Sequence, residues 1–220
     1  MEKEKPLKGK KILITGGPVW VPIDKVRVIT NVFGGSLGLV LAKKAAQHGA
    51  QVVFLLGPTR IDVPKSLPSN LKIIRFKYFN ELLKLMEKEV KNKCDVVIHS
   101  AAVPDYIPKN VFNGKIKSGE KELAISFKPT LKIVDLIKKW NFSVFLVKFK
   151  LEVGLTKKQL LNVAYKSMIF SKADLMVANK FEDVRGKHKA FILDNNKNIV
   201  ECEGKEVIAQ KLLRKVKELL

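Results

Sequence analysis

Residues 11–18 read KILITGGP, a short apolar run that ends in two glycines and a proline. Such a run is typical of a strand buried on both faces of a sheet, and Gly-Gly-Pro marks the turn that closes it. Residues 36–48 then carry apolar side chains at helical spacing, and Gly49 stands where a helix usually ends. This part of the chain therefore predicts a strand, a turn and a helix as the first unit of an α/β fold.

The same alternation of strands and helices continues to the end of the chain. The expected strands are residues 11–15, 51–56, 71–76, 95–100, 144–149 and 174–178. The expected helices are residues 36–48, 80–91 (with Asn80 as N-cap), 130–140, 156–171 and 204–220. A hairpin is expected from residues 190–193 and 199–202. The pattern predicts a single domain over residues 1–220, Rossmann-like and doubly wound, with a mostly parallel sheet, helices on both faces and a C-terminal hairpin.

Ligands of such sheets bind beyond the carboxyl ends of the strands. The loops expected to converge on one cleft follow Thr15, Leu56, Ser100, Phe149 and Ala178. Residues 104–127 fit no strand–helix unit, and a connection of that length is usually functional. We expect this segment to form a flap.

Composition limits the class of protein. Hydrophobic residues make up 46% of the chain, an ordinary share for a globular protein. No apolar run of about 18 residues is present, and the charged N-terminus does not resemble a secretory signal. The two cysteines, Cys94 and Cys202, are too few for a disulfide framework or a Cys-based zinc site. A cytoplasmic protein that does not bind membranes is expected.

The charge of the chain is strongly positive. Forty-two basic residues face twenty-one acidic ones, which gives a formal net charge of +21. A charge of this size suggests nucleic acid as a partner. The lysines are spread along the whole chain, however, and no nucleic-acid-binding motif is present. A lysine-biased surface or an anionic small-molecule substrate explains the charge equally well, and nucleic acid is not the expected partner.

Two sites near the first strand have the chemistry of ligand binding. Gly16 and Gly17 allow backbone N–H groups to approach a phosphate, although the turn is neither G-x-G-x-x-G nor a P-loop, and a plain turn is the alternative. Asn31 stands before a glycine-rich helix start, where its amide can donate to a ligand or simply form a turn.

Further candidates follow the strand at residues 95–100. A carboxylate at the end of a strand, such as Asp105, suits a ribose hydroxyl, a base amine or a metal, and equally a helix cap. Lys115 and Lys117 alternate, so in extended chain both can reach one anion or lie in solvent. The histidines lack metal-site spacing, and His99 reads as a core histidine.

Taken in order, several segments carry a family resemblance. They are PIDKVRVITN at residues 22–31, AAVPDY at 101–106, GKIKS at 114–118, FKLE at 149–152 and DLMVAN at 174–179. Together they resemble phosphopantothenate–cysteine ligase, also called phosphopantothenoylcysteine synthetase, over nearly the whole chain. The FKLE form resembles stand-alone members, and no fused flavin-dependent decarboxylase domain is expected.

The resemblance implies a nucleotide-dependent ligase of coenzyme A biosynthesis. In this family CTP or ATP, with Mg²⁺, activates the carboxylate of phosphopantothenate as an acyl-nucleotidylate, and L-cysteine then displaces the nucleotide monophosphate. The resemblance also implies a homodimer, with Lys115 and part of residues 106–127 near its interface. Such chemistry requires cations and backbone N–H groups placed around developing negative charge. The ligands of the metal are not assigned.

The resemblance also implies residue roles. Asn31 handles the acyl intermediate, and Lys115 stabilises this intermediate and the nucleotide phosphates. Asp105 contacts the nucleotide, and Phe149 lines its pocket. The further nucleotide-binding candidates are Gly16, Gly17, Ala101, Ala102, Val103, Lys117 and the helix lysine Lys166.

Departures from the family pattern leave alternatives open. Asn31 is followed by VFGGS where family members show x-S-[ST]-G, which removes two hydroxyl groups, and Lys148 takes the place of a glycine before Phe149. One alternative is a catalytically altered nucleotide-binding protein on the same fold. Another is an NAD(P)-dependent reductase, for which Arg60 is a hint but the G-x-G-x-x-G turn is missing.

Overall fold

The computed structural model describes residues 6–119, 121–184 and 186–220. The long strands are β1 (Lys11–Gly16), β4 (Gln51–Leu56), β5 (Leu71–Arg75), β6 (Val96–His99), β9 (Phe145–Glu152), β10 (Leu175–Lys180), β11 (Lys189–Asp194) and β12 (Ile199–Glu203). The helices are α1 (Ser36–Gln47), α2 (Phe79–Lys91), α3 (Ile133–Trp140), α4 (Lys157–Phe170), α5 (Phe181–Val184) and α6 (Lys205–Leu219). None of these described helices is long and apolar enough to cross a membrane.

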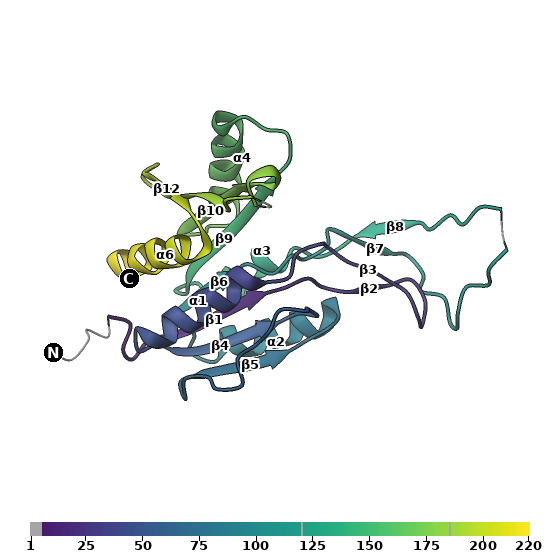
Figure 1. The fold of residues 1–220 in the computed structure, drawn as a ribbon, viewed down its shortest axis with the longest axis horizontal. Helices are drawn as coiled ribbons and strands as arrows, with labels where there is room; N and C mark the ends of the chain where they lie inside the picture. Colours follow the sequence, from purple (N-terminus) through teal and green to yellow (C-terminus); the bar gives the residue numbers. More distant parts are fainter. Residues whose placement is uncertain (1–5, 120, 185) are drawn as a thin grey trace.

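The long strands form one sheet in the order β12-β11-β10-β9-β6-β1-β4-β5 (Figure 1). Neighbouring strands are parallel from β5 to β10, and β10, β11 and β12 pair antiparallel. The chain builds outward from β1 to β5 on one side, then returns to place β6 on the other side of β1. This confirms the expected doubly wound, mostly parallel sheet with its C-terminal hairpin.

Helices cover both faces of the sheet, as expected. Successive residues of a strand point to opposite faces, and in β1 Ile12 belongs to one core and Leu13 to the other. The Ile12 core contains buried residues of α1 and α6, among them Leu41 and Leu212. The Leu13 core contains buried residues of α2, α3 and α4, among them Met86. Because both faces are buried, the strands read as continuous apolar runs in the sequence.

Two helix starts differ from expectation. Asn80 is not the N-cap of α2, because the helix begins at Phe79 and the Glu81 carboxylate accepts the backbone N–H of Lys77 at 2.7 Å. Helix α3 begins at Ile133 instead of residue 130. The reason is that Thr130 is bonded elsewhere, its hydroxyl donating to the Pro104 carbonyl at 2.7 Å.

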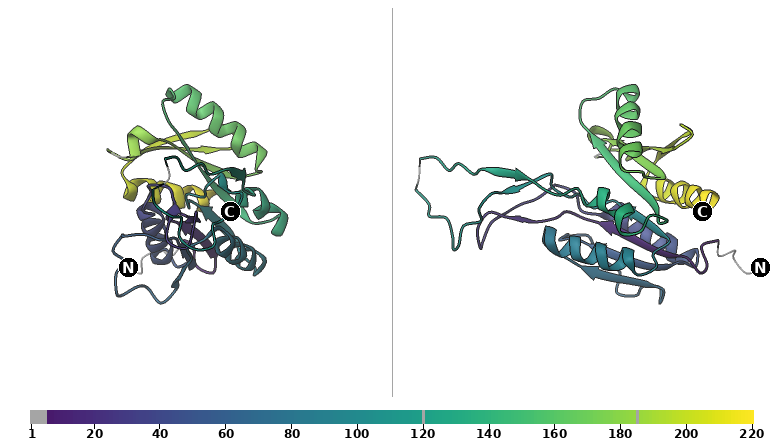
Figure 2. Two further views of the ribbon diagram at one scale, coloured as in Figure 1. Left: turned by 90° about the vertical axis from the view of Figure 1, so that its right-hand side faces the viewer. Right: turned by 180° about the vertical axis from the view of Figure 1, so that it is seen from behind.

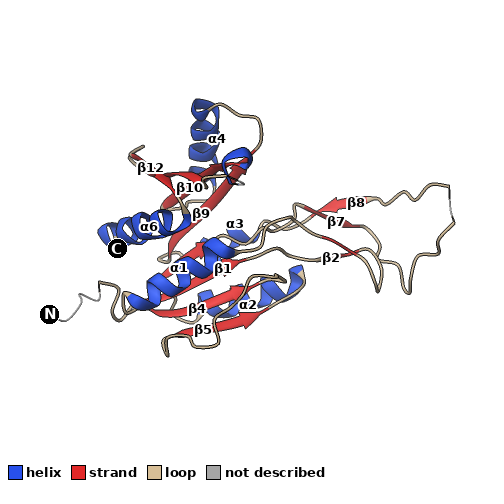
Figure 3. Ribbon diagram, in the orientation of Figure 1, coloured by secondary structure: helices blue, strands red, loops and turns tan. Residues whose placement is uncertain are grey.

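Four short strands were not expected from the sequence: β2 (Val21–Pro22), β3 (Val28–Ile29), β7 (Tyr106–Pro108) and β8 (Phe127–Pro129). β2 pairs with β3, and β7 pairs with β8. Both ribbons project from the same end of the sheet and run together (Figures 1 and 2), and their strands are short, with a turn between β2 and β3 and a longer connection between β7 and β8 (Figure 3). We call residues 19–32 and 104–131 the arm. The flap expected at residues 104–127 lies within it, with Glu120 outside the described residues.

Candidate active site

A pocket of about 710 Å³ opens where the strand order reverses, at the carboxyl ends of β1, β6, β9 and β10. Chain connections diverge at this point of an open α/β sheet and leave a crevice for a ligand. The volume falls in the range of small-molecule sites. Most of the lining comes from residues 31–38, 99–105, 130–134 and 148–151.

One expected loop does not line this pocket. Beyond Leu56 the ladder with β1 continues for one more bond, in which Gly57 N donates to Gly16 O at 2.9 Å, and residues 57–70 do not line the pocket. The loop then supports the pocket from outside, because the Thr59 hydroxyl donates to Gly34 O at 2.6 Å. The segments that follow β1, β6 and β10 do contribute, as expected, whereas β9 contributes residues 148–151 of the strand itself.

Glycines allow two backbone segments to meet beside the pocket. Gly17 follows β1 with φ of 82°, and Gly35 caps the start of α1 with φ of 80°. A Cβ on Gly35 would overlap Gly17 N and lie 2.7 Å from Gly17 Cα, so only glycine fits there. Of the two glycines predicted to bind ligand, Gly17 lines the pocket, whereas Gly16 packs against the buried ring of Phe54.

Asn31 connects two predicted parts of the site. Its side-chain amide donates to Ala102 O at 3.0 Å, and Ala102 N in turn donates to Gly17 O at 3.0 Å. Next to them, Ala101 N donates to the Thr15 hydroxyl at 3.0 Å. The structure thus brings together segments that lie about seventy residues apart in the sequence. The predicted site residues that line the pocket are Gly17, Asn31, Ala101, Ala102, Val103, Asp105 and Phe149.

The pocket has a basic lining. Among the described residues, four lysines line it, Lys132, Lys148, Lys150 and Lys205, against one acidic residue, Asp105. The Asp105 carboxylate is paired with the Lys132 ammonium group at 2.6 Å, and both side chains are largely exposed. An excess of positive charge in a concave site favours an anionic ligand.

The sequence identified Lys148 only as the residue that replaces a family glycine before Phe149, not as a residue of the site. In the structure Lys148 lines the pocket, and its ammonium group donates to Ser167 O and to the Ser171 hydroxyl, both at 3.2 Å. Partial burial lowers the pKa of Lys148 below its usual range, and Asp135 opposes that shift. The spacing of the lysines could have indicated this position. Lys148 and Lys150 are two residues apart at the carboxyl end of a strand and therefore share a face of the sheet.

His99 lies at the end of β6, where it lines the pocket although it is only 8% exposed. Its Nδ1 is 3.0 Å from the Thr15 hydroxyl oxygen. Burial, with a smaller contribution from Lys148, lowers the pKa of the imidazole to about 4. His99 is therefore a neutral, hydrogen-bonded core histidine at neutral pH, as expected from the sequence.

We expect His99 to make the protein less stable in mild acid. Its pKa is about 4 when folded and 6.5 ordinarily, so between these pH values the unfolded chain binds a proton that the folded chain does not. The free energy of unfolding is therefore unaffected above about pH 6.5 and falls by up to about 3 kcal/mol as the pH approaches 4. Denaturant unfolding of wild type and His99→Gln at about pH 7 and about pH 4.5 measures this. Equal losses in both proteins would exclude His99 as the group responsible.

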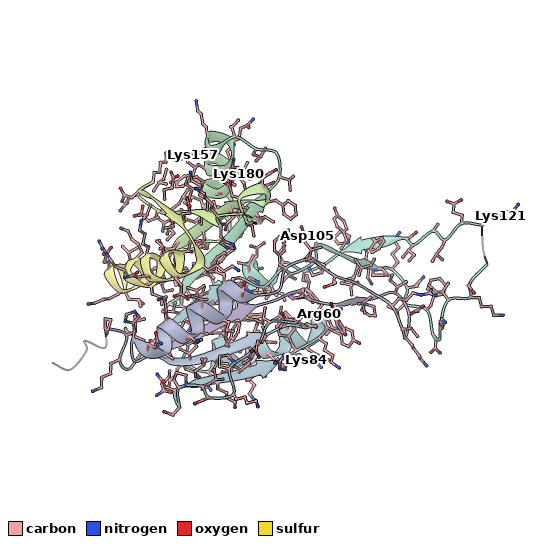
Figure 4. The ribbon with its side chains drawn as sticks, viewed as in Figure 1. Arg60, Lys84, Asp105, Lys121, Lys157 and Lys180 are labelled. Atoms are coloured by element: carbon pink, nitrogen blue, oxygen red, sulfur yellow. The ribbon has the colours of Figure 1, made fainter. Side chains whose placement is uncertain are left out.

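Three predicted binding lysines lie outside the pocket lining. Lys166 is on the exposed surface of α4, although its neighbour Ser167 lines the pocket. Lys115 and Lys117 are exposed on the arm, with Ile116 half-buried between them. Figure 4 shows how far the arm reaches, with Asp105 at its base and Lys121 at its tip. The roles of these lysines stay predictions.

Residues 7–220 match the family described as DFP, the DNA/pantothenate metabolism flavoprotein C-terminal domain. The chain belongs to this family. The resemblance found in the sequence motifs is thereby confirmed at the level of the family.

Solved and curated relatives of the DFP domain agree with this assignment. The DNA/pantothenate metabolism flavoprotein of Streptococcus pneumoniae has a TM-score of 0.87 at 30% identity, covering 96% of this chain and 100% of that one. The coenzyme A biosynthesis bifunctional protein CoaBC of Thermococcus kodakarensis is 34% identical over 98% of this chain. CoaBC of Bacillus subtilis is 33% identical over 89% of it.

This DFP domain spans about half the length of the curated relatives it matches, 53% of the Thermococcus protein and 45% of the Bacillus protein. The family match, from residue 7 to residue 220, includes all the lining residues of the pocket that the structure describes.

Proposed function

We propose that this chain is a phosphopantothenate–cysteine ligase that acts in coenzyme A biosynthesis. The observation that carries the proposal is the pocket at the reversal of the strand order, where Asn31 and Ala102 meet and where four lysines are among the described lining residues. Relatives named as coenzyme A biosynthesis proteins support the same reaction.

The proposed reaction has two steps, and in both the protein acts by charge and position. First, a carboxylate oxygen of phosphopantothenate attacks the α-phosphorus of CTP or ATP, and the bond to pyrophosphate breaks. Then the amine of L-cysteine attacks the activated carbonyl carbon, loses a proton, and expels the nucleotide monophosphate. Negative charge develops on phosphate oxygens in the first step and on the carbonyl oxygen in the second. Lysines such as Lys148 and Lys150 and the backbone N–H groups near Gly17 are suited to stabilise it.

Mg²⁺ fits this proposal as part of the nucleotide co-substrate. Among the described residues, no group of three or more His, Cys, Asp or Glu side chains could hold a metal ion. Mg²⁺ usually keeps several waters and is held by one or two carboxylates together with substrate phosphates. Asp105 is the one carboxylate among the described lining residues. The metal would therefore arrive with the nucleotide.

A homodimer formed through the arm is part of the proposal. Large apolar side chains are exposed along the arm, and a free apolar surface of this kind usually marks an interaction site. These side chains are Val26, Ile29, Val32, Tyr106, Val111, Phe112, Leu123, Phe127 and Leu131. A second copy of the chain would cover them by pairing the same surface with itself. Lys115 is on this arm and away from the pocket of its own chain. Dimerisation through the arm would place Lys115 near the pocket of the partner.

The distribution of basic residues supports a small anionic substrate instead of nucleic acid. Lys84 on α2, Lys121 on the arm and Lys157 on α4 lie in separate parts of the molecule (Figure 4), so the basic side chains are not gathered on one face. An NAD(P)-dependent reductase is also disfavoured, because the chain after β1 enters the β2–β3 hairpin before it reaches α1. The dinucleotide fingerprint requires a direct turn from strand to helix.

Pyrophosphate release tests the proposed function. The protein is incubated with phosphopantothenate, Mg²⁺ and either CTP or ATP, with and without cysteine. Release that requires phosphopantothenate is the expected result, and the more active nucleotide identifies the preferred base. Absence of release from a folded protein with either nucleotide would contradict the proposal and favour a nucleotide-binding protein on the same fold.

Asn31→Asp is expected to slow amide formation by about ten- to a hundredfold. The carboxylate has no N–H to donate to Ala102 O, so it leaves this carbonyl unpaired and places two oxygens against each other. Steady-state kinetics with saturating nucleotide, phosphopantothenate and cysteine measure the loss. Unchanged kinetics would show that the altered sequence after Asn31 has moved its role to another residue.

A further inference from the structure

Asp24 lies in the turn between β2 and β3, near the outer part of the arm. It is an aspartate that is only 3% exposed. One carboxylate oxygen accepts the backbone N–H groups of Val26 and Arg27 at 2.8 and 2.6 Å. The other accepts the backbone N–H of Ile116 at 3.1 Å, from the second ribbon of the arm. One side chain therefore both closes a turn and bridges two segments 92 residues apart in the sequence.

Further bonds join the same two segments around Asp24. The Arg27 guanidinium group lies 3.5 Å from the Asp24 carboxylate and donates to Ile116 O at 3.4 Å. Lys25 N donates to Gly114 O at 3.0 Å, and Phe112 N donates to Ile23 O at 3.0 Å. The N–H and the C=O of Ile116 are thus both bound to the β2–β3 turn.

The bound peptide units are those on either side of the Ile116 Cα. Because these two peptide units are held in place, the backbone that carries the side chains of Lys115 and Lys117 is also held in place. Ile116 is half-buried and both lysines are exposed, as expected for alternating side chains in extended chain. The contacts hold the backbone and leave the ammonium groups free for a ligand.

We propose that Asp24 is a positioning residue that holds the Lys115–Lys117 segment of the arm in place for phosphate or acyl-phosphate binding. Its own carboxylate is fully used by the arm, so it acts through Lys115 and does not touch the substrate. The inference rests on the proposed function for the role of Lys115, and on geometry alone for the contact with Ile116.

The charge of Asp24 matters for this role. The hydrogen bonds from Ile116, Val26 and Arg27, together with the Arg27 charge, lower the pKa of its carboxyl below the usual range. Asp24 is therefore ionised at neutral pH, with acceptor oxygens on both sides. In Asp24→Asn one of these becomes an NH₂ group, which cannot accept the bond from Ile116 while the other oxygen serves the turn.

Hydrogen exchange at the Ile116 amide tests the contact independently of any activity. In Asp24→Asn we expect this amide to exchange about tenfold faster or more, because a bond to a charged acceptor is lost. Asp24→Ser is a second variant that retains an oxygen for the turn but does not reach Ile116. Asp62→Asn, at an exposed aspartate outside the arm, is the matched control and should not alter the exchange. Unchanged exchange in both Asp24 variants would overturn the proposal.

A double-mutant comparison tests the route through Lys115. Asp24→Asn should lower kcat at saturating substrates by about tenfold or more in the wild-type background, and have little further effect in Lys115→Gln. An equal loss in both backgrounds would overturn the proposal. If wild type shows no ligase activity, the proposed function fails, and the exchange measurement still decides whether Asp24 holds Ile116.

Discussion

Lys115→Gln is expected to lower the rate of amide formation by about a hundred- to a thousandfold and to leave the fold intact. Removing one preorganised cation or donor from a site of developing charge has an effect of this size. The fold should be unaffected because the Lys115 side chain is exposed. Initial rates with saturating nucleotide, phosphopantothenate and cysteine, together with the thermal unfolding midpoint, measure both parts.

Lys128→Gln is the matched control for this prediction. Lys128 is also an exposed lysine of the arm, in β8, and its replacement removes the same charge. It should retain nearly wild-type turnover. Wild-type turnover in folded Lys115→Gln would exclude Lys115 as a catalytic residue.

Mixing two variants of strongly reduced activity decides which pocket Lys115 serves. A dimer of one Lys115→Gln chain and one Asn31→Asp chain has one pocket with both residues intact only if Lys115 acts on the pocket of the partner. Random mixing should then restore about a quarter of the wild-type activity. If Lys115 acts on its own pocket, each pocket of the mixed dimer keeps one defect, and no activity returns.

Gly35→Ala is expected to lower the free energy of unfolding by about 2 to 5 kcal/mol and to weaken nucleotide binding. Left-handed backbone costs a residue with a Cβ about 1–2 kcal/mol, and overpacking adds about 1–3 kcal/mol. The added Cβ would lie 2.7 Å from Gly17 Cα, so backbone, not a flexible side chain, must move. Both glycines line the pocket, and the shift would change its shape.

Gly154→Ala separates the two contributions. Gly154 has a similar φ of 70°, but no atom lies within 4 Å of the position of an added Cβ. This variant should therefore show only the backbone cost. Denaturant unfolding of both variants gives the difference due to the close approach of Gly35 and Gly17. Equal losses of stability would show that Gly17 shifts freely and that the approach is not a constraint.

The central sheet and much of the pocket could be predicted from the sequence. Runs such as residues 51–56 are apolar throughout because both faces of the sheet are covered, and that pattern is local. Parallel strands place their carboxyl ends at one edge, so Gly17, Asn31 and Phe149 could be expected to meet. Apolar runs and the order of strands and helices can be read directly from the sequence.

The start of α3 shows where local reasoning failed. Residues 130–132 have a helical pattern, but the Thr130 backbone N–H donates to Asp105 O at 2.9 Å. A tertiary hydrogen bond thus replaces the first turn of the expected helix. Lys148 was missed for a related reason, because its contacts with Ser167 and Ser171 come from α4 and the residue after it.

The sequence by itself determined the strand–helix order, the doubly wound sheet and the segments that border the pocket, because these follow from apolar periodicity and turn chemistry. Only the tertiary structure decided how the arm is built and which lysines face the pocket. The strands of the arm are two or three residues long and have no apolar period. Their geometry depends on bonds such as Asp24 to Ile116, between residues 92 positions apart. A bond of this kind leaves no local pattern, since its donor and acceptor are brought together only by the tertiary fold.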